Sequence, residues 1–479
     1  MSSEKKPNIS RRRFGKGLVA ASTLPFACNF IPAHAMGKLE KPALVGIGAG
    51  GKGQTDLKKS VDAGMNVVGL VDTVDATKLG NTSERRLRSM GQVRDAYPDA
   101  RYFSDYREMF AAMGDKFDAV TVSTPDHHHF HASSMAMKMG KHVYCQKPLT
   151  RTISESRALA KLAQETGVQT QMGNQAHANN HMRRCIELIR SGIVGKIQEI
   201  HAWTNRPIWP QGFAEAPPVS QVPAWLNWQQ WIGPSAWVDY SPYIAPFNWR
   251  GWWNYGAGAL GDMACHIMDM GFWAMQPAPP TSVFAEQVGA TSLSAPINSK
   301  VTWQFPANEY SSKSGFQYFW YDGFIDARFE RDGWRLIKNG DEYNHPADSV
   351  MEGLSFEEYN TVVVGEKGKL YFNQGKDNWL VKPSTILDGF SWPEISLPRA
   401  PGQDNYQEWV DAIHGRLPHG ESHFAYAGPF TETILLGVLA QRFPNEKHQW
   451  DADNMRIVGR DDLTSFIAPE YRSGWIPTA

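Results

Sequence analysis

The stretch at residues 42–72 restricts the fold of this chain more than any other. An apolar run leads into a G-x-G-x-x-G sequence, a helix-like segment follows, and a second apolar run ends at Asp72. The glycines of the loop are Gly48, Gly50, Gly51 and Gly53. Such glycines let the backbone turn sharply and approach a pyrophosphate at a helix N-terminus. A lone glycine motif is weak evidence, but this order predicts a strand–helix–strand unit that binds a dinucleotide.

Asp72 bears on which dinucleotide binds. It lies about twenty residues beyond the loop, where a carboxylate accepts hydrogen bonds from a ribose diol. An aspartate also repels a 2′-phosphate, so we expect NAD as the cofactor. Lys52 and the basic pair Arg85 and Arg86 leave NADP as the alternative.

The order of predicted elements divides the chain in two. Strand and helix patterns alternate through residue 173, which predicts a parallel sheet with right-handed crossovers. Short alternating segments fill 282–372 and predict an antiparallel sheet, and helices are expected at 406–414 and 430–440. We therefore expect an α/β fold: a Rossmann-type parallel-sheet domain at 40–173, then an α+β domain at 174–479 with a large open antiparallel sheet.

Lys147 is the first candidate catalytic residue. It follows the apolar run at 141–144, and Pro148 forces the chain to turn there. A strand end is where an α/β sheet keeps its ligand crevice. A lysine beside buried apolar residues has its charged form disfavoured, which suits a proton donor or acceptor. The alternative is an ordinary surface lysine at a strand end.

Histidines and cysteines raise the question of a metal. Three consecutive histidines occupy 127–129, but successive side chains of an extended stretch point in different directions. We expect a loop at the mouth of the sheet, near the nicotinamide, and no metal. Beyond the first 35 residues the cysteines are Cys145, Cys185 and Cys265, which have neither metal-ligand spacing nor the pattern of a disulfide framework.

Asp262 and His266 form a second candidate pair. They follow a glycine-rich turn, and in a helix their i, i+4 spacing places them on one face. Asp269 lies three residues further, on the same side. A carboxylate one turn from an imidazole can orient it and raise its basicity, which suits a general base. The alternatives are a helix-start aspartate beside a core histidine, or two metal ligands without a third.

A long loop rich in Pro, Trp and Tyr occupies 207–246. So long a loop usually has a function, and covering an active site is the obvious one. The chain has 18 Trp, and an indole face can stack on a sugar, although most of them are expected in the core. The formal net charge of −1 suggests neither nucleic acid nor an anionic membrane as a partner.

The first 35 residues have the order of a targeting segment. A twin-arginine pattern at 10–14 precedes a mildly apolar run at 17–31 and a small-x-small site at 33–35. This predicts a twin-arginine signal peptide at 1–35 and a periplasmic or other extracytoplasmic protein that is exported folded. The alternatives are a disordered basic tail, or a lipid anchor at Cys28 with a poor lipobox. No later run is long enough to span a membrane.

Taken together, these motifs resemble the Gfo/Idh/MocA oxidoreductase family. The matching parts are the glycine loop, Thr124-Pro125-Asp126-x-x-His129, Gln146-Lys147-Pro148 and Asp262-x-x-x-His266. The family usually has Glu-Lys-Pro where this chain has Gln146, a difference that preserves the lysine. The resemblance implies a dinucleotide-binding domain followed by a domain with an open antiparallel sheet, whose free face holds homo-oligomers together in many members.

The resemblance also implies roles. His266 would take the proton of a sugar hydroxyl as hydride leaves for the nicotinamide, while Lys147 bonds the same oxygen and Asp262 orients His266. The implied cofactor-binding residues, besides the loop glycines and Asp72, are Thr124, Pro125, His129 and Lys147. The implied substrate residues are Asn174, His177, Trp249, Arg250, Tyr255 and Asp262.

Three functions remain open from the sequence. The first is an oxidoreductase acting on a carbohydrate or cyclic polyol, with a tightly bound NAD that is recycled in place. The second is an NAD-dependent glycosidase, which oxidises a ring hydroxyl transiently, eliminates the aglycone and re-reduces the ring; it needs a further base, for which Tyr255, His177 and Asp269 are candidates. The third is a non-enzymatic sugar-binding or scaffold protein.

Overall fold

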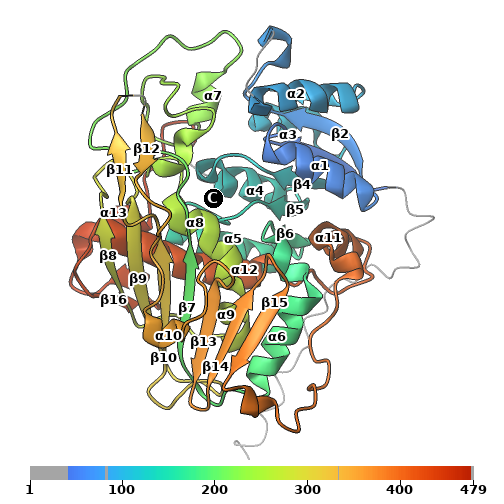
Figure 1. Ribbon diagram of the computed structural model, residues 1–479. Helices are drawn as coiled ribbons and strands as arrows, with labels where there is room; N and C mark the ends of the chain where they lie inside the picture. The colour runs from blue at the N-terminus through green and yellow to red at the C-terminus, as the bar shows by residue number, and fades with distance from the viewer. Residues whose placement is uncertain (1–40, 81–84, 333, 476–479) are drawn as a thin grey trace, which may run out of the picture. The chain divides into compact units, whose positions relative to one another are not determined.

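The computed structural model describes residues 41–80, 85–332 and 334–475 (Figure 1). The predicted signal peptide at 1–35, including Cys28, lies outside the described residues, as do the side chains of Arg85 and Arg86. Among the described residues, no helix is long and apolar enough to cross a bilayer.

The first half of the chain forms a parallel sheet of six strands in the order β3-β2-β1-β4-β5-β6. The strands are β1 (Ala43–Ile47), β2 (Asn66–Val71), β3 (Arg101–Phe103), β4 (Ala119–Val122), β5 (His142–Cys145) and β6 (Thr170–Met172). The prediction of a Rossmann-type parallel sheet is confirmed. The strand order reverses between β1 and β4, and a sheet of this type keeps its ligand crevice at that point, beyond the carboxyl ends.

Helices connect these strands, and the local sequence sets where they begin and end. The Glu155 carboxylate accepts a hydrogen bond from the Thr152 N–H (3.0 Å) at the start of α5, and Gly167 ends this helix with φ 66°. The Asp105 side chain caps α3 by accepting from the Arg107 N–H at 2.8 Å. The helical elements of this half are α1 (Lys52–Asp62), η1 (Ala76–Lys78), α2 (Arg85–Ala96), α3 (Tyr106–Met113), η2 (Asp126–His128), α4 (His129–Lys138) and α5 (Ile153–Thr166).

The second sheet has nine strands in the order β15-β14-β13-β7-β10-β9-β8-β16-β17. They are β7 (Ile197–Thr204), β8 (Ser282–Val288), β9 (Asn298–Phe305), β10 (Phe316–Asp322), β13 (Thr361–Gly365), β14 (Lys369–Asn373), β15 (Asn378–Lys382), β16 (His448–Asp451) and β17 (Arg456–Ile457). β11 (Ala327–Glu330) and β12 (Arg335–Lys338) form a separate hairpin. The predicted large sheet is present, but it is mixed, because β10 runs parallel to β7. A parallel neighbour requires a long crossover, which the connection between β7 and β10 provides.

Helices cover this second sheet and hold its core. α8 (Gly258–Ile267) packs against β7 and β10, and α12 (Phe424–Arg442) packs against α8, β8 and β9 (Figure 1). α12 is longer than the predicted helix at 430–440, because it is apolar on nearly every side and has no polar face to reveal its period. The remaining helical elements are η3 (Gln175–Ala178), α6 (Asn180–Arg190), α7 (Trp228–Ile232), η4 (Asn248–Gly251), α9 (Asp269–Met275), α10 (Asp348–Met351), η5 (Ser384–Leu387), η6 (Pro401–Gln403), α11 (Asn405–Ile413), η7 (Asp461–Leu463) and α13 (Thr464–Ile467).

α11 returns from the second half of the chain to the first sheet. Tyr406, Trp409 and Val410 of this helix are buried in one core cluster with Leu44 and Tyr144 of the parallel sheet. The Tyr144 and Tyr406 rings stack with centroids 4.6 Å apart. The core beneath the glycine loop is therefore built from both ends of the sequence.

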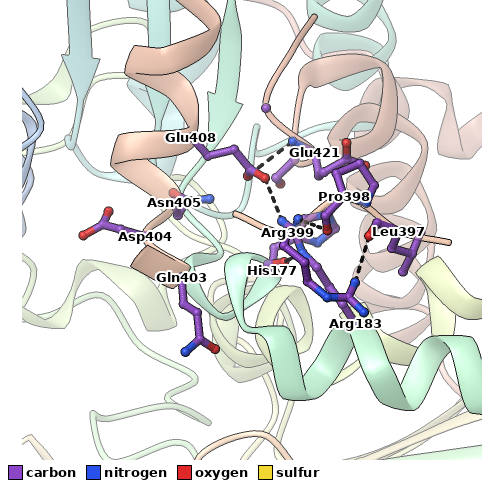
Figure 2. Close-up of polar contacts among 12 residues, drawn as sticks. His177, Arg183, Leu397, Pro398, Arg399, Gln403, Asp404, Asn405, Glu408 and Glu421 are labelled. Carbon is purple, nitrogen blue, oxygen red and sulfur yellow. Dashed lines mark hydrogen bonds and ion pairs between the residues drawn. The ribbon is translucent and has the colours of Figure 1, made fainter. Parts of the chain in front are cut away.

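A buried ion pair fixes the position of α11 (Figure 2). The Arg183 guanidinium, on α6, donates to the Glu408 carboxylate at 2.7 Å and to the carbonyls of Pro398 (2.7 Å) and His177 (3.1 Å). Gln171 of β6 donates to the other Glu408 oxygen at 3.3 Å. Because both charges are fully buried and bonded, this cluster specifies how α6, α11 and β6 meet.

Candidate active site

A cavity of about 510 Å³ opens at the carboxyl ends of β1, β2, β4 and β5. The residues predicted for the site that line this cavity are Gly48, Gly50, Gly51, Asp72, Thr124, Pro125, Lys147, Trp249, Arg250 and His266. They come from both halves of the chain, so one cavity joins the glycine loop to Lys147 and His266. Asp262, also predicted as a catalytic and substrate residue, is not among the described residues that line the cavity.

Two of the loop glycines, Gly48 and Gly53, have no room for a side chain. Gly48 has φ 77°, and a Cβ there would lie 2.7 Å from the Thr124 nitrogen. A Cβ on Gly53 would lie 1.9 Å from the Gly48 carbonyl oxygen. α1 begins directly after Gly51, and its first residue, Lys52, lines the cavity beside the loop. This is the cradle that a pyrophosphate requires.

Asp72 lies beside this cradle with its carboxylate fixed. One oxygen accepts from the Gly50 N–H (2.8 Å) and the other from the Val74 N–H (3.0 Å). Burial raises the pKa of Asp72, and these backbone N–H groups oppose the rise. The predicted ribose acceptor is therefore held at the edge of the glycine loop.

Lys147 also lines the cavity and is paired with Asp262. Its Nζ lies 2.6 Å from Asp262 Oδ1 and 3.1 Å from the Asp262 carbonyl oxygen. Asp262 Oδ1 also lies 3.2 Å from Arg250 Nε. Burial opposes ionisation of Asp262, but Arg250 and Lys147 outweigh it and hold the pKa of this carboxyl below its usual range.

His266 lines the cavity one helical turn after Asp262. Burial, together with the charge of Lys147, lowers the pKa of His266 to about 3, so the imidazole is neutral near pH 7 but is a weaker base than an ordinary histidine. Among the described residues, no hydrogen bond joins Asp262 to His266, which differs from the expectation that Asp262 orients the ring. The Asp262 carboxylate instead contacts two cations, which attract it more strongly than a neutral imidazole does.

Arg250 connects the two halves of the site. Its Nη1 lies 3.4 Å from Asp126 Oδ1, and its guanidinium lies 4.3 Å from the centroid of the Trp249 ring. Asp126, which is 1% exposed, also accepts from the Ala257 N–H at 3.3 Å. Asp126 belongs to the Thr-Pro-Asp motif, but the sequence does not predict it as a site residue, because its partner Arg250 lies 124 residues away.

Two family models match this chain. One, described as an oxidoreductase family with an NAD-binding Rossmann fold, matches residues 41–174, and its C-terminal alpha/beta domain matches 181–282. The chain belongs to the Gfo/Idh/MocA oxidoreductase family. The predicted resemblance is thereby confirmed, and the first domain has the NAD-binding Rossmann fold of the family.

Individual relatives are distant. Levoglucosan dehydrogenase of Pseudarthrobacter phenanthrenivorans is 27% identical over 151 residues, which is 32% of this chain and 31% of the relative. The scyllo-inositol 2-dehydrogenase (NADP(+)) of Bacillus subtilis is 22% identical over 226 residues, which is 47% of this chain and 52% of the relative. These matches thus span about a third to a half of the relatives' length. The WlbA dehydrogenase of Bordetella pertussis, solved with NADH and UDP-GlcNAcA, superposes with a TM-score of 0.56 over 86% of this chain and 100% of its own, at 15% identity.

Gln146 stands where the family usually has glutamate, and its surroundings explain the amide. Its Nε2 lies 3.0 and 3.1 Å from the two carboxylate oxygens of Asp56, which is fully buried on α1. Asp56 also accepts from the hydroxyls of Tyr406 and Ser123, each at 2.6 Å, and from Lys52 at 2.5 Å. A glutamate at 146 would place a second carboxylate against Asp56, whereas the amide donates to it.

The structure places Gly53 and His129 behind the cavity wall. Gly53 lies in the first turn of α1. His129 starts α4, and its ring nitrogens lie 2.7 Å from the Pro148 carbonyl and 3.0 Å from the Thr124 carbonyl. His129 thus ties the end of β4 to the loop that carries Lys147.

Asn174, His177 and Asp269 form a buried network away from the cavity. Asn174 donates to Asp269 at 3.0 Å, His177 Nδ1 lies 2.9 Å from the same oxygen, and the Tyr426 hydroxyl donates to the other oxygen at 2.6 Å. Tyr255 is buried against Trp231. None of Asn174, His177, Asp269 and Tyr255 is among the described residues that line the cavity. The three candidate bases of a glycosidase are therefore not positioned to contact a ligand there.

The histidine run is not the predicted loop. Asp126–His128 form a 3-10 turn and His129 begins α4, so all three histidines are buried. The Nε2 atoms of His127 and His128 each lie 2.9 Å from the Trp231 carbonyl oxygen. This polar contact fixes residue 231 over the cavity, which His128 and Trp231 both line.

A strap, residues 225–247, lies over the cofactor end of the cavity. Val74 and Leu226 form an antiparallel bridge, with hydrogen bonds from the Asp75 N–H to the Trp225 carbonyl (2.8 Å) and from the Asn227 N–H to the Thr73 carbonyl (2.9 Å). The strap residues that line the cavity are Leu226, Gln230, Trp231, Ala245, Pro246 and Phe247.

Trp475 adds a further wall that the sequence did not indicate. The Arg107 guanidinium lies 3.9 Å from the Trp475 ring centroid, and Arg107 also donates to the Gly474 carbonyl (3.1 Å) and to Gln230 of the strap (3.2 Å). Arg107 therefore holds both the strap and the last described residues against the cavity.

Proposed function

We propose that this protein transfers a hydride between a hydroxyl of a sugar or cyclic polyol and a bound NAD. The observation that carries the proposal is a single cavity that holds the glycine cradle and Asp72 at one end, and Lys147 with a neutral His266 at the other. The names of relatives, a levoglucosan dehydrogenase and a scyllo-inositol 2-dehydrogenase, support a small polyhydroxylated substrate.

The residues present fit a dinucleotide. Gly48 and Gly53 leave no room for a Cβ, α1 begins at the cavity with Lys52, and Asp72 offers a carboxylate near the loop. Thr124 and Pro125 line the cavity at the end of β4, next to Lys147. The nicotinamide supplies the hydride acceptor when it is bound.

Lys147 and His266 bind and deprotonate the substrate hydroxyl, and Asp262 positions Lys147. Lys147 donates a hydrogen bond to the reacting oxygen and stabilises the negative charge that grows on it. Asp262 holds the ammonium group in place at 2.6 Å. The neutral imidazole of His266 accepts the hydroxyl proton.

The choice of NAD over NADP rests on Asp72. Its carboxylate is fixed by two N–H groups and cannot turn away from a ribose. A 2′-phosphate carries up to two negative charges, and its approach to this group is unfavourable.

We further propose that the cofactor is retained between turnovers. The strap is tied to Thr73 and Val74 directly after Asp72, and Trp475 closes another side. Releasing a dinucleotide would break these contacts. Retention agrees with export of a folded protein, so we also propose an extracytoplasmic location.

Product analysis tests the proposed function. The purified protein is incubated with a panel of sugars and polyols, and the molecular masses of the products are measured by mass spectrometry. A product two hydrogens lighter than its substrate, in an amount matching the bound dinucleotide, is the expected result. Free sugar released from an aryl glycoside without any oxidised product would instead favour a glycosidase.

A further inference from the structure

The charged groups at the substrate end of the cavity are balanced. Two cations, Lys147 and Arg250, lie there with two carboxylates, Asp126 and Asp262. Asp262 contacts both cations, at 2.6 and 3.2 Å, and Asp126 lies 3.4 Å from Arg250. Each cation thus has a carboxylate partner before any substrate arrives.

We propose that the substrate of this site is a neutral sugar or polyol, and that Asp126 sets this preference by neutralising Arg250. The inference rests on the proposed function and names the substrate class of the same site. The relative solved with UDP-GlcNAcA binds a sugar acid, so the family fold does not decide between neutral and acidic sugars.

Arg250 is not free to turn towards a substrate carboxylate. Its guanidinium lies 4.3 Å from the Trp249 ring centroid and 5.7 Å from that of Trp209, and 18% of the side chain is exposed. The two indole rings pack beside the guanidinium, Nη1 donates to Asp126, and Nε forms an ion pair with Asp262. Arg250 acts as a positioning residue that joins Asp126 of the first domain to Asp262 of the second.

Two other cations near the cavity, Lys52 and Arg107, are each paired with a carboxylate away from the substrate end. Lys52 belongs to the glycine loop and bonds Asp56 at 2.5 Å. Arg107, behind Trp475, bonds Asp105 at 2.6 Å. Among the described residues that line the cavity, no cation is left to pair with a sugar carboxylate at the substrate end.

A carboxylate on the substrate would therefore be a third negative charge beside two positive ones. Removing such an unpaired charge from water is unfavourable. The positive charge of an oxidised nicotinamide does not remove the problem, because it disappears as the hydride arrives. We expect kcat/KM for a neutral sugar to exceed that for the matched sugar acid by at least about ten-fold.

The test uses the purified full-length protein with its bound dinucleotide. The probes are two matched pairs of a neutral sugar and its acid: glucose with glucuronate, and galactose with galacturonate. The measured quantity is the ratio of kcat/KM, neutral over acid, for each pair. In Asp126→Asn one negative charge is lost, so the ratio should fall about ten-fold or more. In Arg250→Gln one positive charge is lost, so the ratio should rise while overall activity falls.

Asp105→Asn is the matched control, because Asp105 is a buried carboxylate that lines the same cavity but pairs with Arg107. Its ratio should equal that of the wild type. The inference is overturned if the wild type uses the acids as well as the neutral sugars, or if Asp126→Asn and Arg250→Gln shift the ratio in the same direction. If no sugar of either kind reduces the bound dinucleotide, the proposed function itself fails.

Discussion

The two ends of the cavity are built in different ways. The cofactor end is made mostly from one contiguous stretch, because Gly48 and Asp72 are only 24 positions apart and directly follow the neighbouring strands β1 and β2. The substrate end is assembled from Lys147 on one domain and from Arg250 and His266 on the other. A local motif fixes the first end, whereas the second depends on how distant segments meet, and the two should respond differently to mutation.

The largest effect is expected at the cofactor end, from Gly53→Ala. The new Cβ would lie 1.9 Å from the Gly48 carbonyl oxygen, so the loop must open and the pyrophosphate cradle is lost. We expect the purified variant to release no dinucleotide on denaturation. Gly91→Ala on α2 is the control, since a Cβ there meets nothing within 4 Å. Full cofactor content in Gly53→Ala would contradict the assignment of this loop.

The next largest effect is expected at the substrate end, from Lys147→Met. Removing the group that stabilises the developing negative charge should lower kcat by about 10³-fold. The glycine loop is untouched, so the dinucleotide content should remain that of the wild type. Lys161→Met, at an exposed lysine of α5, is the control. Loss of cofactor together with activity would show that Lys147 acts in binding.

These two ends also differ in how well the sequence predicted them. The sequence predicts the glycine loop, Asp72 and Lys147 from local signals, which are a motif, a spacing and a strand end, and the structure places Gly48, Asp72 and Lys147 in the lining of one cavity. His177 and Tyr255 were expected at a ligand, but the structure buries them in polar and aromatic contacts that no local pattern reveals. Asp126, Tyr406 and Trp475 were missed because each acts through a partner more than 100 residues away.

A smaller effect, on stability, tests whether distant segments hold the site together. Arg183→Met leaves the Glu408 carboxylate buried without its cation, and we expect the free energy of unfolding to fall by about 3–5 kcal/mol. Adding Glu408→Gln should restore part of the loss, because the uncompensated charge is gone. Chemical denaturation of both variants measures this. An effect below about 1 kcal/mol, as for an exposed ion pair, would contradict the role given to this cluster.

The smallest effect concerns pH. Burial and the charge of Lys147 lower the pKa of His266 to about 3. A lowered pKa means that the imidazole stays neutral well below the ordinary histidine value, so kcat/KM should not fall as pH decreases from 8 to about 5. The measurement is a pH profile of kcat/KM for the best neutral sugar. An acid limb near pH 6.5 that disappears in His266→Asn would show that His266 titrates normally.

The most direct test of the central claim is an absorbance measurement on the purified protein with no cofactor added. The account predicts that the absorbance band of reduced nicotinamide appears on addition of a neutral sugar or polyol, up to one equivalent per chain, and that Lys147→Met slows this change by about 10³-fold. A protein that releases no dinucleotide when denatured and binds none when it is supplied would contradict the account, because the cradle from Gly48 to Asp72 would then have no ligand.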